Sequence, residues 1–345
     1  MFIKILIYTT LFSFFIFDSV QTFSQSHGSN SAESWLNRPI GARAIGMGSA
    51  YTAAANEPTG IFYNPACLSG FSNTPQFSLM FSPLGFGRTH SALAYGQTLS
   101  EEFGVGVGVN HLYHGSFTAR NVFGHNLGEF TNEQFSFMAA GSWKTGVFSA
   151  GAALKYLFNT LRGSGSNGTA FTADLGAKAD IAELFTVGVT AQNLFGSMSW
   201  NNSTVGDKLP FTIRAGAAVE ISLSSSSYTV RKNVRGETET IQLPPSSYLT
   251  LSIDAVQRQY EDNPAFLFGA DYVVIPEFSL RGGIPLYGNK RGVGALMPFT
   301  AWGGGFSIAP DIKDLPFSLQ IDYAISSETM LESQTAHYFS LIIGF

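Results

Sequence analysis

The feature that most constrains this chain is a period of two in its hydrophobic side chains, which runs from about residue 75 to the last residue. In the final segment, bulky apolar residues occupy every odd position from Phe339 to Phe345, and the preceding segment repeats the pattern from Phe317 to Ile325. Because successive side chains of a β-strand point to opposite faces, the pattern predicts strands with one apolar and one small or polar face. It predicts about fourteen strands, roughly at 75–83, 89–99, 102–113, 132–143, 146–159, 168–180, 184–195, 210–223, 246–258, 264–274, 277–286, 297–309, 316–326 and 335–345.

Alternation alone leaves a soluble β-sandwich and a membrane barrel open, and the composition separates them. Charged residues make up only 12% of the chain, whereas it contains 31 Phe and 13 Tyr. The surface of a sandwich is richer in Lys and Glu, while lipid accepts an aromatic outer face. Strands in lipid must close into a barrel, because an open edge leaves backbone amides unpaired. We therefore predict an all-β fold, a transmembrane antiparallel β-barrel of about 14 strands over residues 75–345.

Both ends of the chain favour export to the outer membrane of a Gram-negative-type bacterium. Lys4 precedes an apolar stretch from Ile5 to Phe17, too short to span a hydrocarbon core of ~30 Å as a helix. This predicts a secretory signal peptide at residues 1–25. A terminal aromatic residue, Phe345, closes the last amphipathic strand, which is typical of the signal read by the barrel-assembly machinery. The expected partners thus include outer-membrane lipid and that machinery.

Residues 26–74 do not alternate and are dominated by small side chains. Asn64 and Pro65 form a favourable N-cap and first-turn pair for a short helix. Some 45 residues of this composition cannot bury a core of their own. We predict that they form a small N-terminal plug, or hatch, inside the barrel, and that Gly104, Gly106 and Gly108 are a thin inward face that makes room for it.

The plug also carries a resemblance to a known family. The segments GARAIGMGSAYTAAA (41–55) and GIFYNPACLS (60–69) resemble the N-terminal signature of PorV/PorQ-type outer-membrane proteins, which are distantly similar to FadL long-chain fatty-acid transporters. Ala191 to Leu194, Leu209 to Phe211 and Asp322 to Ala324 extend the resemblance over the chain. Cys67 stands where a glycine is usual, and Asn56-Glu57-Pro58 replaces a more acidic pair.

The resemblance implies a fourteen-stranded barrel with an N-terminal hatch. It favours a role in the type IX secretion system, in which the protein handles secreted cargo proteins at the outer membrane. The alternative is a FadL-like channel that passes hydrophobic small molecules, such as fatty acids or aromatics, through a plugged barrel.

Three groups of candidate site residues follow from the predicted faces. The first is a set of inward charges of both signs, for which a salt-bridge network that grips the plug is favoured over a substrate path: Lys155, Asp174, Lys178, Arg214, Glu220, Asp254, Asp271, Arg281 and Asp322. The second, Arg43, Asn64, Pro65 and Ala66, could form a gate in the plug, although Arg43 pairing with a lumen carboxylate and Asn64 capping a turn would serve structure alone. The third comprises possible contacts for a hydrophobic ligand: Met47, Phe62, Tyr63 and Leu68.

Other kinds of site are not expected. His111 and His114 lie at the end of a predicted strand, where residues three apart point to opposite faces, so no metal site is predicted. The six His residues are dispersed, which argues against a catalytic site, and no cofactor is expected. Lys and Arg are scattered singly, unlike a nucleic-acid footprint. Longer polar inserts, including Ser116 to Thr131, Met198 to Lys208, Ser224 to Pro245 and Gly288 to Gly294, are expected as extracellular loops that alternate with short periplasmic turns.

Overall fold

The computed structural model describes residues 33–345 except for 72–73, 182–183, 205, 225–226, 233–237, 244–245, 260, 262, 287–301, 313–314 and 329–333. The predicted signal peptide (1–25), the first residues of the predicted plug (26–32) and an insert predicted at 288–294 lie outside the described residues.

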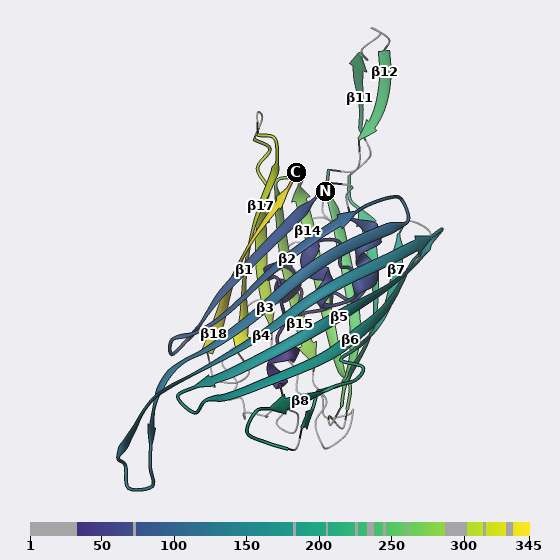
Figure 1. Ribbon diagram of the computed structural model, residues 1–345. Coiled ribbons are helices and arrows are strands. Elements are labelled where there is room, and N and C mark those ends of the chain that lie inside the picture. The colour runs from purple at the N-terminus through teal and green to yellow at the C-terminus, as the bar shows by residue number, and fades with distance from the viewer. Residues whose placement is uncertain are drawn as a thin grey trace.

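Fourteen antiparallel strands close into a barrel (Figure 1), which confirms the predicted fold class. The strands of the wall are β1 (Gln76–Gly85), β2 (Arg88–Thr98), β3 (Phe103–Arg120), β4 (Asn126–Thr145), β5 (Phe148–Arg162), β6 (Ser166–Ile181), β7 (Phe185–Gln192), β10 (Thr212–Ser222), β13 (Tyr248–Arg258), β14 (Ala265–Ile275), β15 (Phe278–Leu286), β16 (Gly303–Ile308), β17 (Ser318–Glu328) and β18 (Gln334–Gly344). The first and last strands close the ring, since Gln76 pairs with Gly344 and Phe81 with Phe339. Each of the fourteen predicted ranges overlaps one of these strands.

The outer face of the barrel is apolar, as a lipid-facing surface requires. Leu154 and Phe171 are each 69% exposed, while their neighbours along the strand, Lys155 and Thr172, are buried on the inner face. Aromatic rings contact one another across the outer face of β3 to β6. At the end of the barrel where β18 ends, Phe345 contacts Phe77 and Phe317. Aromatic residues near both ends of an apolar band are typical of membrane barrels. Among the described residues, no helix combines the length and the hydropathy needed to cross a membrane.

The two ends of the barrel differ. We call the end at which β1 begins and β18 ends the terminal end (top of Figure 1), and the opposite end the distal end. The insert from Ser116 to Thr131 is not the expected loop: β3 and β4 continue as a paired hairpin, with Phe117 opposite Phe130, that projects past the distal end. A β-bulge between Tyr113 and Ser116 separates this hairpin from the wall.

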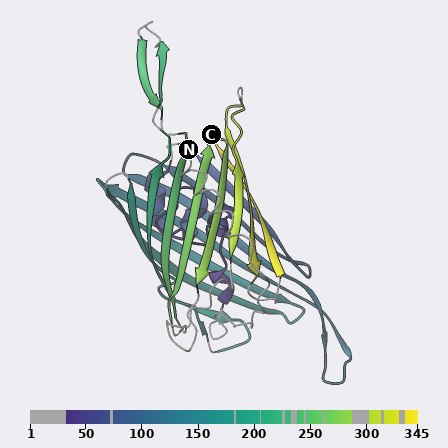
Figure 2. The same ribbon diagram turned by 180° about the vertical axis from the view of Figure 1, so that it is seen from behind.

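A second hairpin, formed by β11 (Ser227–Lys232) and β12 (Thr238–Leu243), projects from the terminal end between β10 and β13 (Figures 1 and 2). The insert from Ser224 to Pro245 therefore lies at the end where short turns were expected, and the expectation that all long inserts share one end is wrong. The insert from Met198 to Lys208 does lie at the distal end, where it contains β8 (Ser197–Trp200) and β9 (Asp207–Lys208).

The described N-terminal residues fill the lumen with short helical turns. They form η2 (Ser34–Asn37), α2 (Ala42–Gly46), η3 (Pro58–Phe62) and η4 (Pro65–Gly70). The last turn begins as the sequence predicts, because the Asn64 side chain accepts a hydrogen bond from the Ala66 N–H and Pro65 follows the cap. In the lumen, α2 packs against β15 to β18 and η4 against β2 to β6, so the plug contacts both halves of the wall.

Candidate functional site

Glycines on the inner face of the wall let the plug approach the backbone of the strands. A Cβ added to Gly104 would collide with the Leu68 carbonyl group, and one added to Gly176 would collide with Asn64 Oδ1. Gly106 and Gly108 face Leu68, Ile61 and Phe62 in the same way. The thin inward face of β3 thus accommodates the plug, as the alternation indicated.

Two buried ion-pair groups join the plug to β10, β13, β14, β15 and β17. In the first, Asp254 Oδ2 accepts hydrogen bonds from the N–H groups of Tyr51 (3.1 Å) and Thr52 (3.0 Å) and from Arg214 Nη2 (2.9 Å). Arg214 Nη2 also donates to the Ser49 carbonyl over 2.7 Å. One carboxylate and one guanidinium of the wall therefore hold a whole turn of the plug.

The second group contains Arg43 of the plug. Arg43 Nε donates to Asp271 Oδ2 over 3.0 Å, while Arg281 Nε donates to Asp271 Oδ1 over 3.0 Å. Arg281 Nη1 also donates to Asp322 Oδ1 over 2.8 Å. Two cations and two wall carboxylates thus alternate in a chain, and the plug supplies one of the cations.

The remaining gate candidates lie close to the wall as well. Asn64 is fully buried, and its Nδ2 donates to the carbonyl groups of Thr52 (3.2 Å) and Ala177 (3.1 Å). Pro65 and Ala66 lie so close to Gly151 that a Cβ there would collide with their backbone. The Asn64 side chain therefore both caps η4 and ties it to β6.

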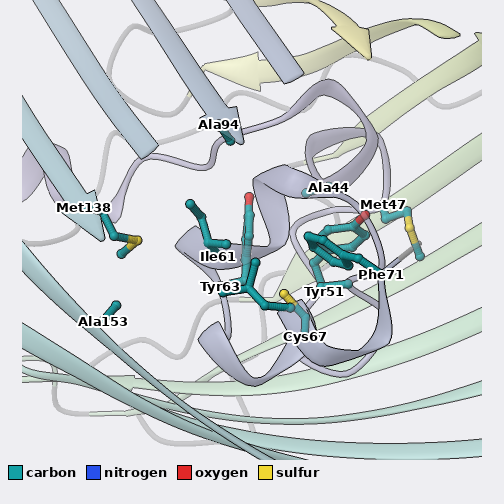
Figure 3. Packing of buried hydrophobic residues seen from close by; sticks show 12 residues of the cluster. Ala44, Met47, Tyr51, Ile61, Tyr63, Cys67, Phe71, Ala94, Met138 and Ala153 are labelled. Atoms are coloured by element: carbon teal, nitrogen blue, oxygen red, sulfur yellow. The ribbon is translucent and has the colours of Figure 1, made fainter. Parts of the chain in front are cut away.

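The predicted ligand contacts lie mainly in the interior of the plug (Figure 3). Met47, Tyr63 and Leu68 are buried with Tyr51 and Cys67 in one apolar cluster, and only Phe62 is partly exposed. The Tyr63 hydroxyl donates to the Ile40 carbonyl over 2.9 Å, and burial raises the pKa of the Cys67 thiol to about 12. A ligand would reach Met47, Tyr63 or Leu68 only if the plug moved.

The predicted lumen charges do not form one continuous network. Beyond the two groups above, Lys155 and Asp174 form a separate pair with 2.6 Å between Nζ and Oδ2. Lys178 lies 3.4 Å from Asp180 near the terminal end, and Glu220 is exposed there.

Sequence reasoning missed a polar cluster around Glu33. The Glu33 carboxylate accepts hydrogen bonds from Asn159 Nδ2 (2.9 Å), Gln134 Nε2 (3.1 Å) and Trp35 Nε1 (2.5 Å). All three donors are neutral. Glu33 lies in a segment without periodicity, so no pattern in the sequence points to its burial.

A second missed feature is a cluster of packed apolar side chains in the distal half of the lumen. We call it the apolar belt; it consists of Leu36, Leu157, Ala170, Met198, Trp200 and Leu209. Leu36 also packs against a neighbouring cluster that contains Trp35, Leu84 and Leu112. The belt therefore continues across the lumen from β5 and β6 to β1 and β3.

The wall is irregular beside the apolar belt. β7 ends at Gln192, so on the side away from β5 the distal part of β6 pairs with β8 instead, at Gly168 and Thr169. Between these places the Leu194 N–H donates to the Ala173 carbonyl over 2.9 Å. A turn and a short hairpin thus replace a regular strand at the position where Met198 and Leu209 enter the belt.

A cavity of about 600 Å³ opens at the terminal end of the lumen. It lies against the second ion-pair group and is lined by residues of the plug and of β10 and β13 to β17, among them Arg43, Glu220, Tyr248, Asp271, Arg281 and Gln320. Arg43 and its partners therefore separate this cavity from the interior of the plug.

No family model and no curated protein sequence matches the chain. Among solved structures, the toluene transporter TodX of Pseudomonas putida has a TM-score of 0.54 at 12% identity, over 88% of this chain and 97% of TodX. The monoaromatic hydrocarbon channel CymD has a TM-score of 0.53 at 13% identity, over 88% and 96%. The chain has the fold of these channels.

A FadL homologue of Pseudomonas aeruginosa is also similar, with a TM-score of 0.48 at 11% identity over 88% of this chain and 97% of the homologue. The likeness to TodX and CymD thus shows the fold of a TodX-like outer-membrane barrel of fourteen strands, which confirms the coarser part of the resemblance. None of these similar structures points to the PorV/PorQ proteins specifically.

Proposed function

We propose that the protein is a non-enzymatic outer-membrane channel for hydrophobic small molecules. The observation that carries this proposal is the apolar belt, which lies inside a plugged lumen and reaches the place where β7 stops short. Pockets for small apolar molecules are lined mainly by hydrophobic side chains with a few polar groups. The titles of two similar structures name a monoaromatic hydrocarbon channel and a toluene transporter, which agrees with such a lining.

The route follows from the order of the features along the barrel. Both chain termini of bacterial barrels face the periplasm, so we assign the terminal end to the periplasm and the distal end to the cell exterior. A molecule would enter the apolar belt from the distal half and leave through the cavity beside Arg43. Since the plug fills the lumen between them, passage requires that part of the plug move.

Two neighbouring leucines on β5 provide the test. Leu157 lies in the belt and is fully buried, whereas Leu154 faces lipid and is 69% exposed. We expect Leu157→Asn to weaken binding of a neutral aromatic probe such as 1-N-phenylnaphthylamine to the purified barrel, and Leu154→Asn to leave it unchanged. Both variants should keep heat-modifiable gel mobility. Equal binding by Leu157→Asn, or no binding by the wild type, would reject the proposal.

Handling of secreted cargo in type IX export is the second candidate function. One observation favours it: the β3–β4 hairpin projects past the distal end and exposes Val122 (93%) and Phe123 (81%) at its tip. Such apolar side chains outside the lipid-facing band suit contact with another protein. Deletion of the gene would then trap cargo in the periplasm, whereas normal export with slowed uptake of hydrocarbons would support the channel instead.

A further inference from the structure

We propose that the lumen selects uncharged hydrophobic molecules and excludes carboxylates such as fatty-acid anions, and that Asp174 and Glu33 determine this selectivity. The inference rests on the proposed channel function and specifies its substrate class. It is carried by the order of side chains along the inner face of β5 and by the partners of the lumen cations.

Four inward residues, at every second position of β5, show the order in which groups follow one another along the lumen. From the distal side they are Asn159, Leu157, Lys155 and Ala153, all buried. Asn159 holds the Glu33 carboxylate, Leu157 belongs to the apolar belt, Lys155 pairs with Asp174, and Ala153 packs against the plug. Successive residues of this series lie about 7 Å apart along the strand, since a strand rises ~3.3 Å per residue. The belt thus lies between the Glu33 carboxylate and the Lys155–Asp174 pair.

A carboxylate at the belt would need a cation, and Lys155 is the nearest one along β5. The Lys155 ammonium is already 2.6 Å from Asp174 Oδ2 and 3.1 Å from Asn193 Oδ1. Asp174 Oδ1 in turn accepts the Asn193 N–H over 2.9 Å, so the pair is held on both sides. Displacing Asp174, which is fully buried, from Lys155 would leave its charge without a cation in a place that water does not reach.

Within the described part of the chain, the other predicted lumen cations are also paired, Lys178 with Asp180 near the terminal end. Arg214 is bound to Asp254, and Arg281 to Asp271 and Asp322. Arg43 also binds Asp271, and Arg38 is not free either. On the distal side of the belt, the donors to Glu33 among the described residues are neutral, so its negative charge repels an incoming anion. An uncharged molecule meets neither obstacle.

A matched pair of ligands tests this selectivity. Dodecanoate and methyl dodecanoate share one hydrocarbon chain and differ in charge at pH 8. We expect the ester to displace 1-N-phenylnaphthylamine from the wild-type barrel and the acid to do so at least about tenfold less well, given the cost of an unpaired charge in the interior.

Two variants test whether Asp174 and Glu33 determine the selectivity. Asp174→Asn keeps an oxygen for the Asn193 N–H but frees the Lys155 ammonium, so dodecanoate should approach the ester in potency while the ester is unchanged. Glu33→Gln removes the negative charge on the other side of the belt and should also favour the acid. Asp311→Asn, at an exposed position outside the barrel strands, is the control for the change in net charge and should alter neither ligand.

The outcomes separate this inference from the proposed function. If the probe binds and both ligands displace it equally from the wild type, the channel proposal stands and the selectivity is rejected. If folded Asp174→Asn and Glu33→Gln gain no affinity for dodecanoate, these carboxylates do not determine selectivity. If neither the probe nor the ester binds to the wild type, the channel proposal itself fails. Should Asp174→Asn not fold, Glu33→Gln carries the test.

Discussion

Arg43 of the plug and Asp271 of β14 form the contact that separates the plug from the terminal cavity, with 3.0 Å between Nε and Oδ2. Asp271 is 1% exposed and shares its other oxygen with Arg281, which binds Asp322 in turn. A single carboxylate thus bridges two guanidinium groups, one on the plug and one on the wall. Loss of its charge would affect the plug and the wall together.

Asp271→Asn is expected to loosen the plug. The substitution leaves two buried guanidinium groups with one fewer carboxylate, and removing one partner of a buried pair costs about 3–5 kcal/mol. We expect a lower unfolding temperature and a larger ion conductance in planar lipid bilayers than for the wild type. The exposed Asp311→Asn should change neither. Unchanged conductance in a destabilised Asp271→Asn barrel would show that this contact does not control opening.

Cys67 provides a direct report of plug movement, because it is the one cysteine of the chain and is 1% exposed. Burial raises the pKa of its thiol to about 12, so little thiolate forms at pH 8. We expect a maleimide reagent to label the folded barrel far more slowly than the barrel unfolded in urea. Labelling should be faster in Asp271→Asn than in the wild type. Rapid labelling of the folded wild type would contradict the packing of the plug.

Strand positions could be predicted from the sequence because the barrel wall is a local pattern. Alternation between lipid and lumen acts on each strand separately, as along Phe339 to Phe345, and so it is readable without knowing the neighbours. The ends were harder to predict. The insert from Ser116 to Thr131 is polar enough for a loop, yet its two arms pair with each other beyond the membrane, where alternation is no longer required.

The site was less predictable because it depends on which inward residues meet. The charges of Arg214, Asp254, Asp271 and Arg281 were readable as inward, but their pairing requires strands up to 40 residues apart to be placed side by side. The short β7 and the burial of Glu33 leave no periodic signal at all. Both arise from the way in which the plug and the segment after Gln192 fill the distal lumen.

Gly176→Ala is expected to displace the plug from β6. A Cβ at this position would collide with Asn64 Oδ1, and the Asn64 side chain is held by bonds to Ala66, Thr52 and Ala177. Overpacking of this kind typically costs about 1–3 kcal/mol. Gly141→Ala is the matched control, because the nearest atom to its Cβ would be the Gly104 carbonyl oxygen at 3.9 Å. Faster Cys67 labelling in Gly176→Ala alone would support the close packing; equal rates in both variants would argue against it.

Glu57 makes the stability of the plug depend on pH. The residue is 5% exposed, Thr59 Oγ1 donates to Glu57 Oε1 over 2.6 Å, and Arg43 Nη1 lies 4.0 Å from Oε2. Burial, and secondly the charge of Asp322, raise the pKa of Glu57 above its ordinary value, although Arg43 opposes this. The folded state therefore binds the proton more tightly than the unfolded state. The stabilisation by protonated Glu57 is fully present below the ordinary carboxyl pKa and is lost as the pH rises through the raised pKa of the folded state.

Gln mimics the protonated form of Glu57, so we expect Glu57→Gln to unfold at a higher temperature than the wild type at pH 8 and at about the same temperature at pH 4. A variant that is less stable than the wild type at pH 8 would show instead that attraction between the Glu57 carboxylate and Arg43 outweighs the cost of burial.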